Sequence, residues 1–235
     1  MIHPRRRSVL RNAAVGVIRQ TRVEDRRYRT GFTLIELLVV IAILSLLVSI
    51  LLPSLARAKT LARITKAHAE LRGITLAIAM YRYENSEQIP PTRFSCQSRT
   101  AYDLPVELMP YLPGGKKNNV DIVQMPDPFT PTECYKYRAV GPAIVNESTI
   151  IPNAANLWIP DGFPGGEADT GQYYSDPKTS PVRYAVYSMG PNPETAKFDI
   201  PGRLPVPSKY WLKNASDTGV IVHFEDNNGQ IYMSP

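Results

Sequence analysis

The strongest pattern along this chain of 235 residues is an almost unbroken apolar run over residues 32–52. Glu36 is its single charged residue, and its other polar side chains are Thr33, Ser45 and Ser49. A helix rises about 1.5 Å per residue, so this run reaches across the ~30 Å hydrocarbon core of a bilayer. A helix buried in a soluble core would show a polar stripe, which is missing here. The pattern therefore predicts a membrane-spanning helix over residues 32–52.

Beyond Pro53 the pattern becomes amphipathic with helical spacing. Apolar residues recur at intervals of three and four among charged ones, at Ile64, Ala67, Leu71, Ile74, Ile78 and Tyr81. This spacing predicts that the helix continues over residues 53–85. Pro53 has no backbone N–H to donate, so we expect a bend or a loosened turn there. The apolar stripe fits either a long coiled coil or packing on the sheet of the chain's own globular domain, and we favour the second.

The last part of the chain, residues 86–235, shows the short alternating pattern of strands. We predict strands over residues 134–140, 182–189 and 220–224, the last paired through an Asn-Gly turn with residues 230–233. Of the 22 prolines, 20 lie from Pro90 onward, which disfavours long helices in this part. The predicted fold class is α+β, with the long N-terminal helix packed on a small antiparallel β-sheet that carries long loops.

Charge separates a basic leader from the rest of the chain. The first 31 residues hold nine Arg and two acidic residues (9 − 2 = +7), whereas the remainder balances to 18 − 19 = −1. The net charge of +6 thus gives no reason to expect a nucleic-acid partner. Arg26, Arg27 and Arg29 directly precede the apolar run. By the positive-inside rule they keep the leader cytoplasmic and make the part after the run extracytoplasmic.

The border between leader and apolar run reads GFTLIE over residues 31–36, followed by LLVVIAIL. This string resembles the class III signal sequence of type IV prepilins and pseudopilins, which also has a proline near the end of the run, here Pro53. The resemblance implies that a prepilin peptidase removes residues 1–31 by cutting between Gly31 and Phe32, and then methylates the new N-terminus of Phe32. The apolar run is longer than that of an ordinary cleavable signal peptide. A leader of 31 residues is long for this family, which leaves the start codon open.

Glu36 follows the predicted cut by only four residues. An ionised carboxylate is costly in hydrocarbon, although at this place it would lie only ~6 Å deep. The resemblance implies that Glu36 pairs with the N-terminal amine of a neighbouring subunit and directs assembly through residues 32–52. A carboxylate that merely reaches for interfacial water is the alternative.

A weaker resemblance extends into the globular part. Residues 127–129 (DPF) with 135–137 (YKY), and residues 187–190 (YSMG) followed by Asp199, are similar in order to segments of the major pseudopilins of type II secretion. Residues 141–181 between them look like an insertion of loops. The resemblance also suggests a calcium site at Asp199. The preceding loop lacks the Asp and Gly residues that are expected around such a site.

The cysteines and histidines add little. Cys96 and Cys134 would lie in an oxidising compartment, where either a disulfide or two separately buried thiols fits. We expect His68 on the polar side of the helix, while His3 lies in the leader and His223 near the end of the chain. Their spacing does not match a zinc-binding pattern.

These observations predict a structural subunit and not an enzyme, because no Gly-x-Ser-x-Gly, phosphate-binding loop or His-anchored triad is present. The resemblance implies a pseudopilin of a type II secretion-like or type IV pilus-like filament. Its partners would be the peptidase, other pilin subunits and an assembly platform in the inner membrane, with the globular domain periplasmic. The alternatives are a type IV pilin or minor pilin with adhesive or DNA-binding loops, and a membrane-anchored enzyme or binding domain.

Overall fold

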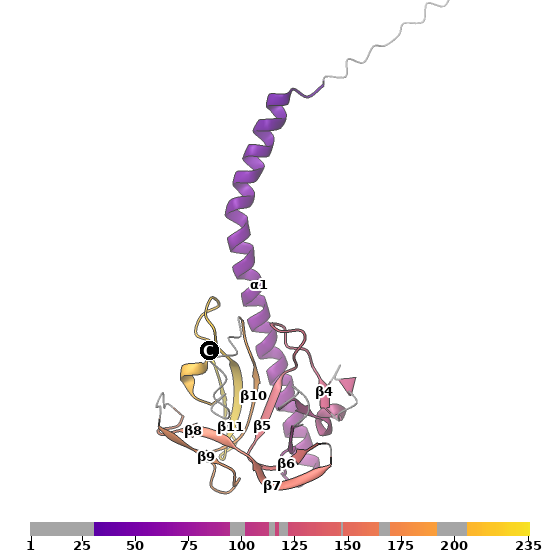
Figure 1. Ribbon diagram of the computed structural model, residues 1–235, viewed down its shortest axis with the longest axis vertical. Coiled ribbons are helices and arrows are strands. Elements are labelled where there is room, and N and C mark those ends of the chain that lie inside the picture. The colour runs from indigo at the N-terminus through magenta and orange to yellow at the C-terminus, as the bar shows by residue number, and fades with distance from the viewer. Residues whose placement is uncertain are drawn as a thin grey trace, which may run out of the picture. The chain divides into compact units, whose positions relative to one another are not determined.

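A computed structural model describes residues 31–94, 102–112, 116–117, 122–146, 148–164, 170–191 and 206–235. The chain divides into two compact units between Leu47 and Val48. Helix α1 (Leu34–Glu84) begins in the first unit and continues in the second, running through Pro53 without interruption (Figure 1). The helix predicted over residues 32–85 is therefore confirmed to within two residues at its start and one at its end.

The centre of the second unit is a four-stranded sheet in the order β12-β11-β10-β5. Its strands are β5 (Lys136–Ala139), β10 (Val182–Ser188), β11 (Ile221–Asp226) and β12 (Ile231–Met233), and each neighbouring pair is antiparallel. The strands and the hairpin that the alternation predicted are all present. Gly229, with φ of +81°, lies in the turn between β11 and β12 and adopts the left-handed conformation expected of an Asn-Gly turn.

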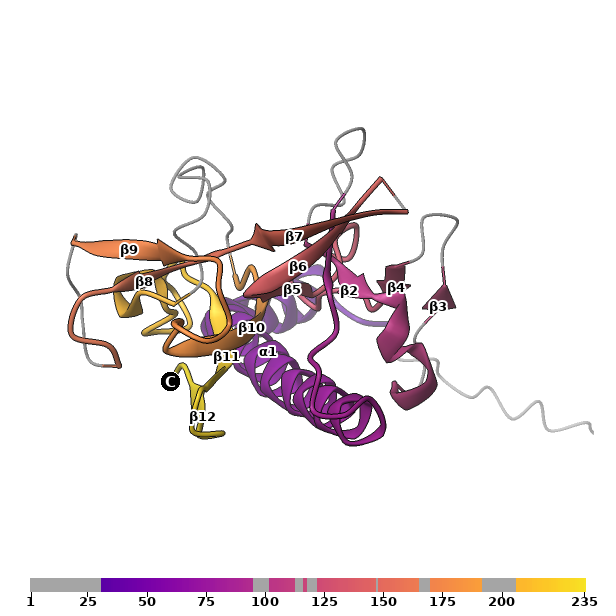
Figure 2. The same cartoon turned by 90° about the horizontal axis from the view of Figure 1, so that it is seen from below.

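Both faces of this sheet are buried. On one face Tyr184 and Ile221 pack against Leu71 and other residues of the amphipathic stripe of α1. On the other face Val222 and Phe224 pack with residues of strand β8 (Leu157–Pro160). Successive residues of a strand point to opposite faces, so β11 contributes to both layers. The amphipathic stripe is thus used within the chain's own domain, as we predicted, and the sheet lies between α1 and β8 (Figure 2).

Residues 141–181 are not simply loops, and our prediction was wrong there. They contain β6 (Gly141–Val145), β7 (Thr149–Ala155), β8 and β9 (Gly171–Tyr174), which form two antiparallel hairpins. Leu157 and Ile159 are buried against the second face of the central sheet, which would otherwise be exposed. Prolines within β6, β7 and β8 obscured the strand pattern, since proline weakens a strand prediction.

Short elements, most of them between α1 and β5, complete the second unit. Strand β1 (Thr92–Phe94) pairs in parallel with β6. A small three-stranded sheet has the order β2-β4-β3, from β2 (Leu104–Pro105), β4 (Ile122–Gln124) and β3 (Lys116–Lys117). Two 3-10 helices lie at Val106–Tyr111 and Ser208–Tyr210. The overall class is α+β with an antiparallel sheet packed on α1, as expected, and among the described sheets only the separate β1-β6-β7 sheet is mixed.

Candidate processing and assembly site

The peptide bond between Gly31 and Phe32 lies just before α1 in a non-helical, exposed segment. The Phe32 side chain is 82% exposed. A Cβ atom added at Gly31 would meet no other atom within 4 Å, so packing inside this chain does not require glycine at this position. A residue without a side chain still lets another protein approach its backbone closely. The geometry fits a bond that is presented to a protease.

Directly after this bond, Thr33 and Glu36 form a reciprocal cap on the first turn of α1. The Thr33 backbone N–H and hydroxyl donate to Oε2 of Glu36, at 2.8 and 2.7 Å. In return the backbone N–H of Glu36 donates to Oγ1 of Thr33 at 3.3 Å. This is a capping box, in which a Thr at the N-cap and a Glu three residues later satisfy free N–H groups of the helix start.

The capping box gives Glu36 a local role that our sequence reasoning missed. The signal was readable, because Thr-x-x-Glu before an apolar run is the sequence pattern of this cap. Among the contacts of the described residues, only Oε2 of Glu36 is engaged, and Oε1 accepts no hydrogen bond. Thr33 therefore holds the carboxylate at the helix start through Oε2.

The apolar part of α1 has no apolar partner within the described structure. α1 is the one described helix that is long and apolar enough to cross a membrane, and none of its apolar window is buried. The exposed side chains include Leu34, Leu44, Ile50 and Leu52. So much exposed apolar surface indicates burial in a bilayer or against other helices. Pro53 lies within α1 directly after this stretch.

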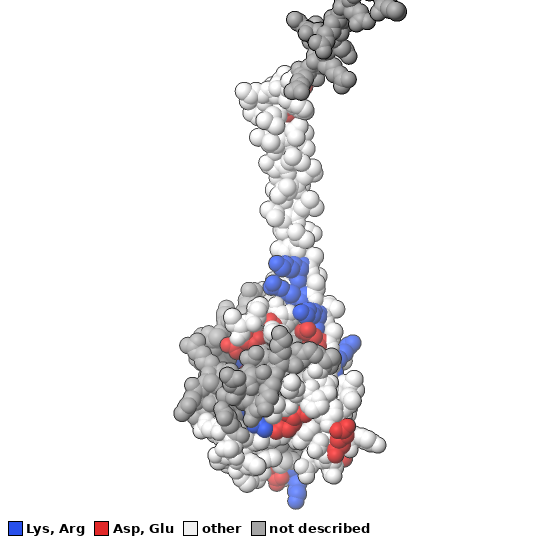
Figure 3. Space-filling model, turned by 90° about the vertical axis from the view of Figure 1, so that its right-hand side faces the viewer, with Lys and Arg blue, Asp and Glu red and all other residues white. Residues whose placement is uncertain are grey.

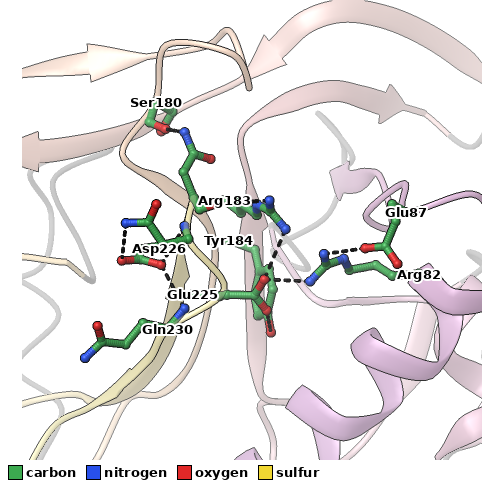
Figure 4. A network of polar contacts seen from close by, with 10 residues as sticks. Arg82, Glu87, Ser180, Arg183, Tyr184, Glu225, Asp226 and Gln230 are labelled. Atoms are coloured by element: carbon green, nitrogen blue, oxygen red, sulfur yellow. Dashed lines mark hydrogen bonds and ion pairs between the residues drawn. The ribbon is translucent and has the colours of Figure 1, made fainter.

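At its other end, α1 is tied to the central sheet by a buried ion-pair network (Figure 4). Glu225 of β11 accepts from Arg82 of α1 at 2.6 Å, from Arg183 at 3.3 Å and from the Tyr184 hydroxyl at 3.0 Å. Arg82 also pairs with the exposed Glu87 at 2.6 Å. The Glu225 side chain is only 6% exposed, so these donors supply the partners that a buried carboxylate requires.

The two tyrosines of the YKY segment explain why that segment matters to the fold. Tyr135 and Tyr137 are fully buried beneath α1. The Tyr135 hydroxyl donates to Glu70 of α1 at 2.6 Å, and the Tyr137 hydroxyl donates to the Pro90 carbonyl at 2.6 Å. Burial, followed by the contact with Glu70, raises the pKa of Tyr135, which keeps its hydroxyl protonated as a donor. The segment thus fixes both α1 and the chain that leaves it.

His68 is not on a purely polar face of α1, contrary to our expectation. Its Nδ1 lies 3.2 Å from Nε2 of the buried His223 on β11, and its Nε2 lies 3.3 Å from the Pro235 carbonyl oxygen. A carbonyl only accepts, so His68 Nε2–H donates to Pro235 and His223 Nε2–H donates to His68 Nδ1. The ring centroids are 5.5 Å apart, so the two nitrogens face each other along one line, as in a hydrogen bond and not as ligands of one metal ion.

The remaining predicted sites fall partly outside the described residues. Asp199, and with it the calcium site, lies outside them, as does Cys96. Cys134 is a free thiol, and burial raises its pKa, so the unreactive thiol form is favoured. In the part of the chain that the structure covers, no group of three or more His, Cys, Asp or Glu side chains could hold a metal ion.

Comparison with known proteins points to the same N-terminal segment. Residues 26–52 match the family described as the prokaryotic N-terminal methylation motif. The chain is 37% identical over 61 residues to the type II secretion system core protein G of Pseudomonas aeruginosa, which is 26% of this chain and 43% of that protein. The chain thus spans less than half the length of this relative. No solved structure matches the chain.

Proposed function

Because the chain belongs with the prepilin-like proteins that carry the N-terminal methylation motif, we propose that it is a structural subunit of a type II secretion-like filament. The subunit is cut between Gly31 and Phe32 by a prepilin peptidase and methylated on the Phe32 amine. It assembles with other pseudopilin subunits on an inner-membrane platform. Residues 32–52 anchor it in the inner membrane, and the domain built on the central sheet is periplasmic. The family match and the resemblance to core protein G support this proposal.

The observation that carries the proposal is the position of Glu36. It is the only charged residue in the apolar stretch, and it stands four residues after the proposed new N-terminus. Cleavage would place a positive amine at Phe32 beside hydrocarbon. Placing either a lone amine or a lone carboxylate beside hydrocarbon costs free energy, and pairing the two charges offsets part of that cost. Thr33 already occupies Oε2 of Glu36, and no other described residue bonds Oε1, which is the acceptor we assign to the amine of a neighbouring copy.

The two roles of Glu36, as a cap and as an assembly partner, can be separated by substitution. Glu36→Gln keeps an amide that can complete the capping box but removes the charge, because Gln also serves at this position. Thr33→Val removes the cap and keeps the charge. We expect both variants to insert into the membrane. We expect Glu36→Gln to lose site-specific crosslinking between copies, while Thr33→Val still crosslinks.

Equal crosslinking of Glu36→Gln and the wild-type protein would show that Glu36 is only a helix cap, and the assembly role would be wrong. A Thr33→Val variant that fails as completely as Glu36→Gln would point to the same conclusion. Glu36→Leu, which removes cap and charge together, should behave as Glu36→Gln does.

Maturation is tested by intact-mass measurement of the protein extracted from membranes of a host that has a prepilin peptidase. The expected product lacks residues 1–31 and carries one additional methyl group. Gly31→Leu should block cleavage, since a bulky side chain would stand at the bond that the peptidase must reach. Gly73→Ala is a matched control in the middle of α1, where an added Cβ also meets nothing within 4 Å. A full-length wild-type product would contradict the proposal.

A further inference from the structure

A group of four cations follows the apolar stretch of α1 and has no acidic residue among them. It consists of Arg57, Lys59, Arg63 and Lys66, and we call it the basic collar. The first acidic residue after Pro53 is Glu70. All four side chains are exposed, and Figure 3 shows Lys and Arg gathered on α1 directly after its uncharged stretch. The rest of the chain beyond the leader, without these four cations, balances to 14 − 19 = −5.

Within the described part of the chain, little neutralises the collar. In the part that the structure describes, Arg57, Lys59 and Arg63 take part in no ion pair. Lys66 reaches Glu70 at 3.8 Å, and both side chains are substantially exposed, at 60% and 30%. An exposed pair of this kind contributes little. The collar is therefore a region of unbalanced positive charge and not part of a surface network of ion pairs.

The distance of the collar from the apolar stretch matches the depth of lipid headgroups. At about 1.5 Å per residue, Arg57 lies ~8 Å beyond Leu52 along the helix, Lys59 ~10 Å and Arg63 ~16 Å. The headgroup layer on each side of a bilayer is roughly 5–8 Å thick. Long Lys and Arg side chains can also extend back along the helix toward it. Arg57 and Lys59 can therefore contact lipid phosphates. Arg63 and Lys66 lie within about one or two Debye lengths of the headgroup layer.

We propose that the basic collar binds the anionic phospholipid headgroups of the leaflet from which residues 32–52 emerge. Guanidinium groups suit phosphate because they donate two parallel hydrogen bonds, and the Lys ammonium adds a point charge. Clusters of Lys and Arg next to a membrane helix are attracted to anionic lipid in this way. An acidic surface on a second copy is the competing partner for the collar. It has less support, because the collar lies at the height along the helix where the bilayer surface is expected.

The collar gains importance through maturation, a step that rests on the proposed function. Before cleavage the nine leader arginines outweigh the four collar cations, so the collar does not reverse the expected direction of insertion. After cleavage the leader is gone, and the collar is the remaining basic segment next to the membrane helix. The mature subunit would then be held electrostatically at its extracytoplasmic side. Transfer of the subunit from the bilayer into a filament would have to break this contact.

The test uses the full chain in phosphatidylcholine vesicles that contain spin-labelled phosphatidylglycerol or spin-labelled phosphatidylcholine. Electron paramagnetic resonance measures the relative association of each lipid with the protein. The collar variant carries Arg57→Gln, Lys59→Gln and Arg63→Gln. The control variant carries the same loss of charge on exposed lysines of the globular domain, as Lys178→Gln, Lys209→Gln and Lys213→Gln. The leader is present in all proteins, so its own attraction for lipid cancels in the comparison.

We expect the preference for phosphatidylglycerol to fall at least threefold in the collar variant and to remain in the control. The difference should disappear in 1 M salt, where the Debye length shrinks to about 3 Å. An unchanged preference in the collar variant overturns the proposal. A second outcome also overturns it. Copies that carry Arg63→Cys could form disulfide crosslinks that an anionic peptide abolishes while the lipid preference stays unchanged. The collar would then bind a second copy.

This readout does not depend on cleavage or filament assembly. If the lipid preference depends on the collar but intact-mass measurement finds no maturation, the lipid contact stands and the proposed function fails. If maturation occurs and the collar variant behaves as the wild-type protein does, the proposed function stands and the lipid contact fails. The collar side chains are exposed, so we expect the variant to fold as the wild-type protein does, which circular dichroism checks directly.

Discussion

The buried carboxylate of Asp127 accepts a hydrogen bond from the backbone N–H of Met189 at 3.0 Å. Its other oxygen accepts from the backbone N–H of Phe129 at 2.8 Å, and its own backbone N–H donates to the Glu133 carbonyl at 2.9 Å. Asp127 thus folds the loop before β5 and fastens that loop to the end of β10. The DPF and YSMG segments, which the sequence singled out separately, meet through this one side chain.

Replacing Asp127 should destabilise the globular domain. Asp127→Ala leaves two partly buried backbone N–H groups without their acceptor, at a cost of up to about 1–3 kcal/mol for each such group. We expect a lower free energy of unfolding in denaturant titrations of the full chain in detergent. Asp161→Ala, at an exposed position, is the control and should stay within about 0.5 kcal/mol of wild type. Equal stability of the two variants would contradict the role assigned to Asp127.

The two acidic partners of Arg82 should differ sharply in their contribution to stability. Glu225→Ala removes the buried acceptor shared by Arg82, Arg183 and Tyr184, and we expect a loss of about 3–5 kcal/mol. Glu87→Ala removes a carboxylate from the same Arg82 at the same 2.6 Å, but its side chain is 70% exposed. We expect a loss of less than about 1 kcal/mol there. Denaturant unfolding of the two variants measures the difference directly.

The His68–His223 pair should make the domain less stable in mild acid. Burial, and then the neighbouring His68 and Arg72, lowers the pKa of His223 to about 4, and burial lowers that of His68 as well. An unfolded histidine takes up a proton near pH 6.5, whereas the folded His223 stays neutral down to about pH 4. The unfolded state therefore binds more protons in this window. The free energy of unfolding should fall by up to about 3 kcal/mol as pH drops through it.

The measurement is the free energy of unfolding between pH 7 and 4.5, and a double variant controls for the carboxylates that begin to titrate at the acidic end of this range. The double variant His68→Leu/His223→Leu retains only His3 among the histidines, so its slope with pH should be much shallower. An identical slope in the double variant and wild type would assign the acid sensitivity to other groups.

Two glycines should respond to alanine in opposite directions. Gly190, in the YSMG segment, has φ of +69°, and a Cβ there would overlap the carbonyl oxygen of Gly219. Gly190→Ala should lose about 1–3 kcal/mol from the backbone conformation alone, and more from the overlap. Gly73 lies exposed in the middle of α1 with no atom near its missing Cβ. Gly73→Ala should gain up to about 1 kcal/mol, because alanine is the better helix former. Thermal unfolding distinguishes the two.

Sequence reasoning succeeded where one short segment carries the whole signal. The apolar stretch, the amphipathic stripe and the β11–β12 hairpin each depend on the spacing of neighbouring residues, and all three are present in the structure. The capping box of Thr33 and Glu36 belongs to the same class, although we overlooked it. The strands within residues 141–181 were missed because their prolines mask the alternation, and because their burial depends on the second face of a distant sheet.

By itself the sequence determined the helix, the apolar stretch that is long enough to cross a membrane and the match to the N-terminal methylation motif, since these properties follow from contiguous residues. Only the tertiary structure decided which polar groups meet. His68 and His223 are separated by 155 positions, and Arg82 and Glu225 by 143. No local spacing encodes such pairs, because the sheet brings them together only after its strands have found their register and both of its faces have been covered.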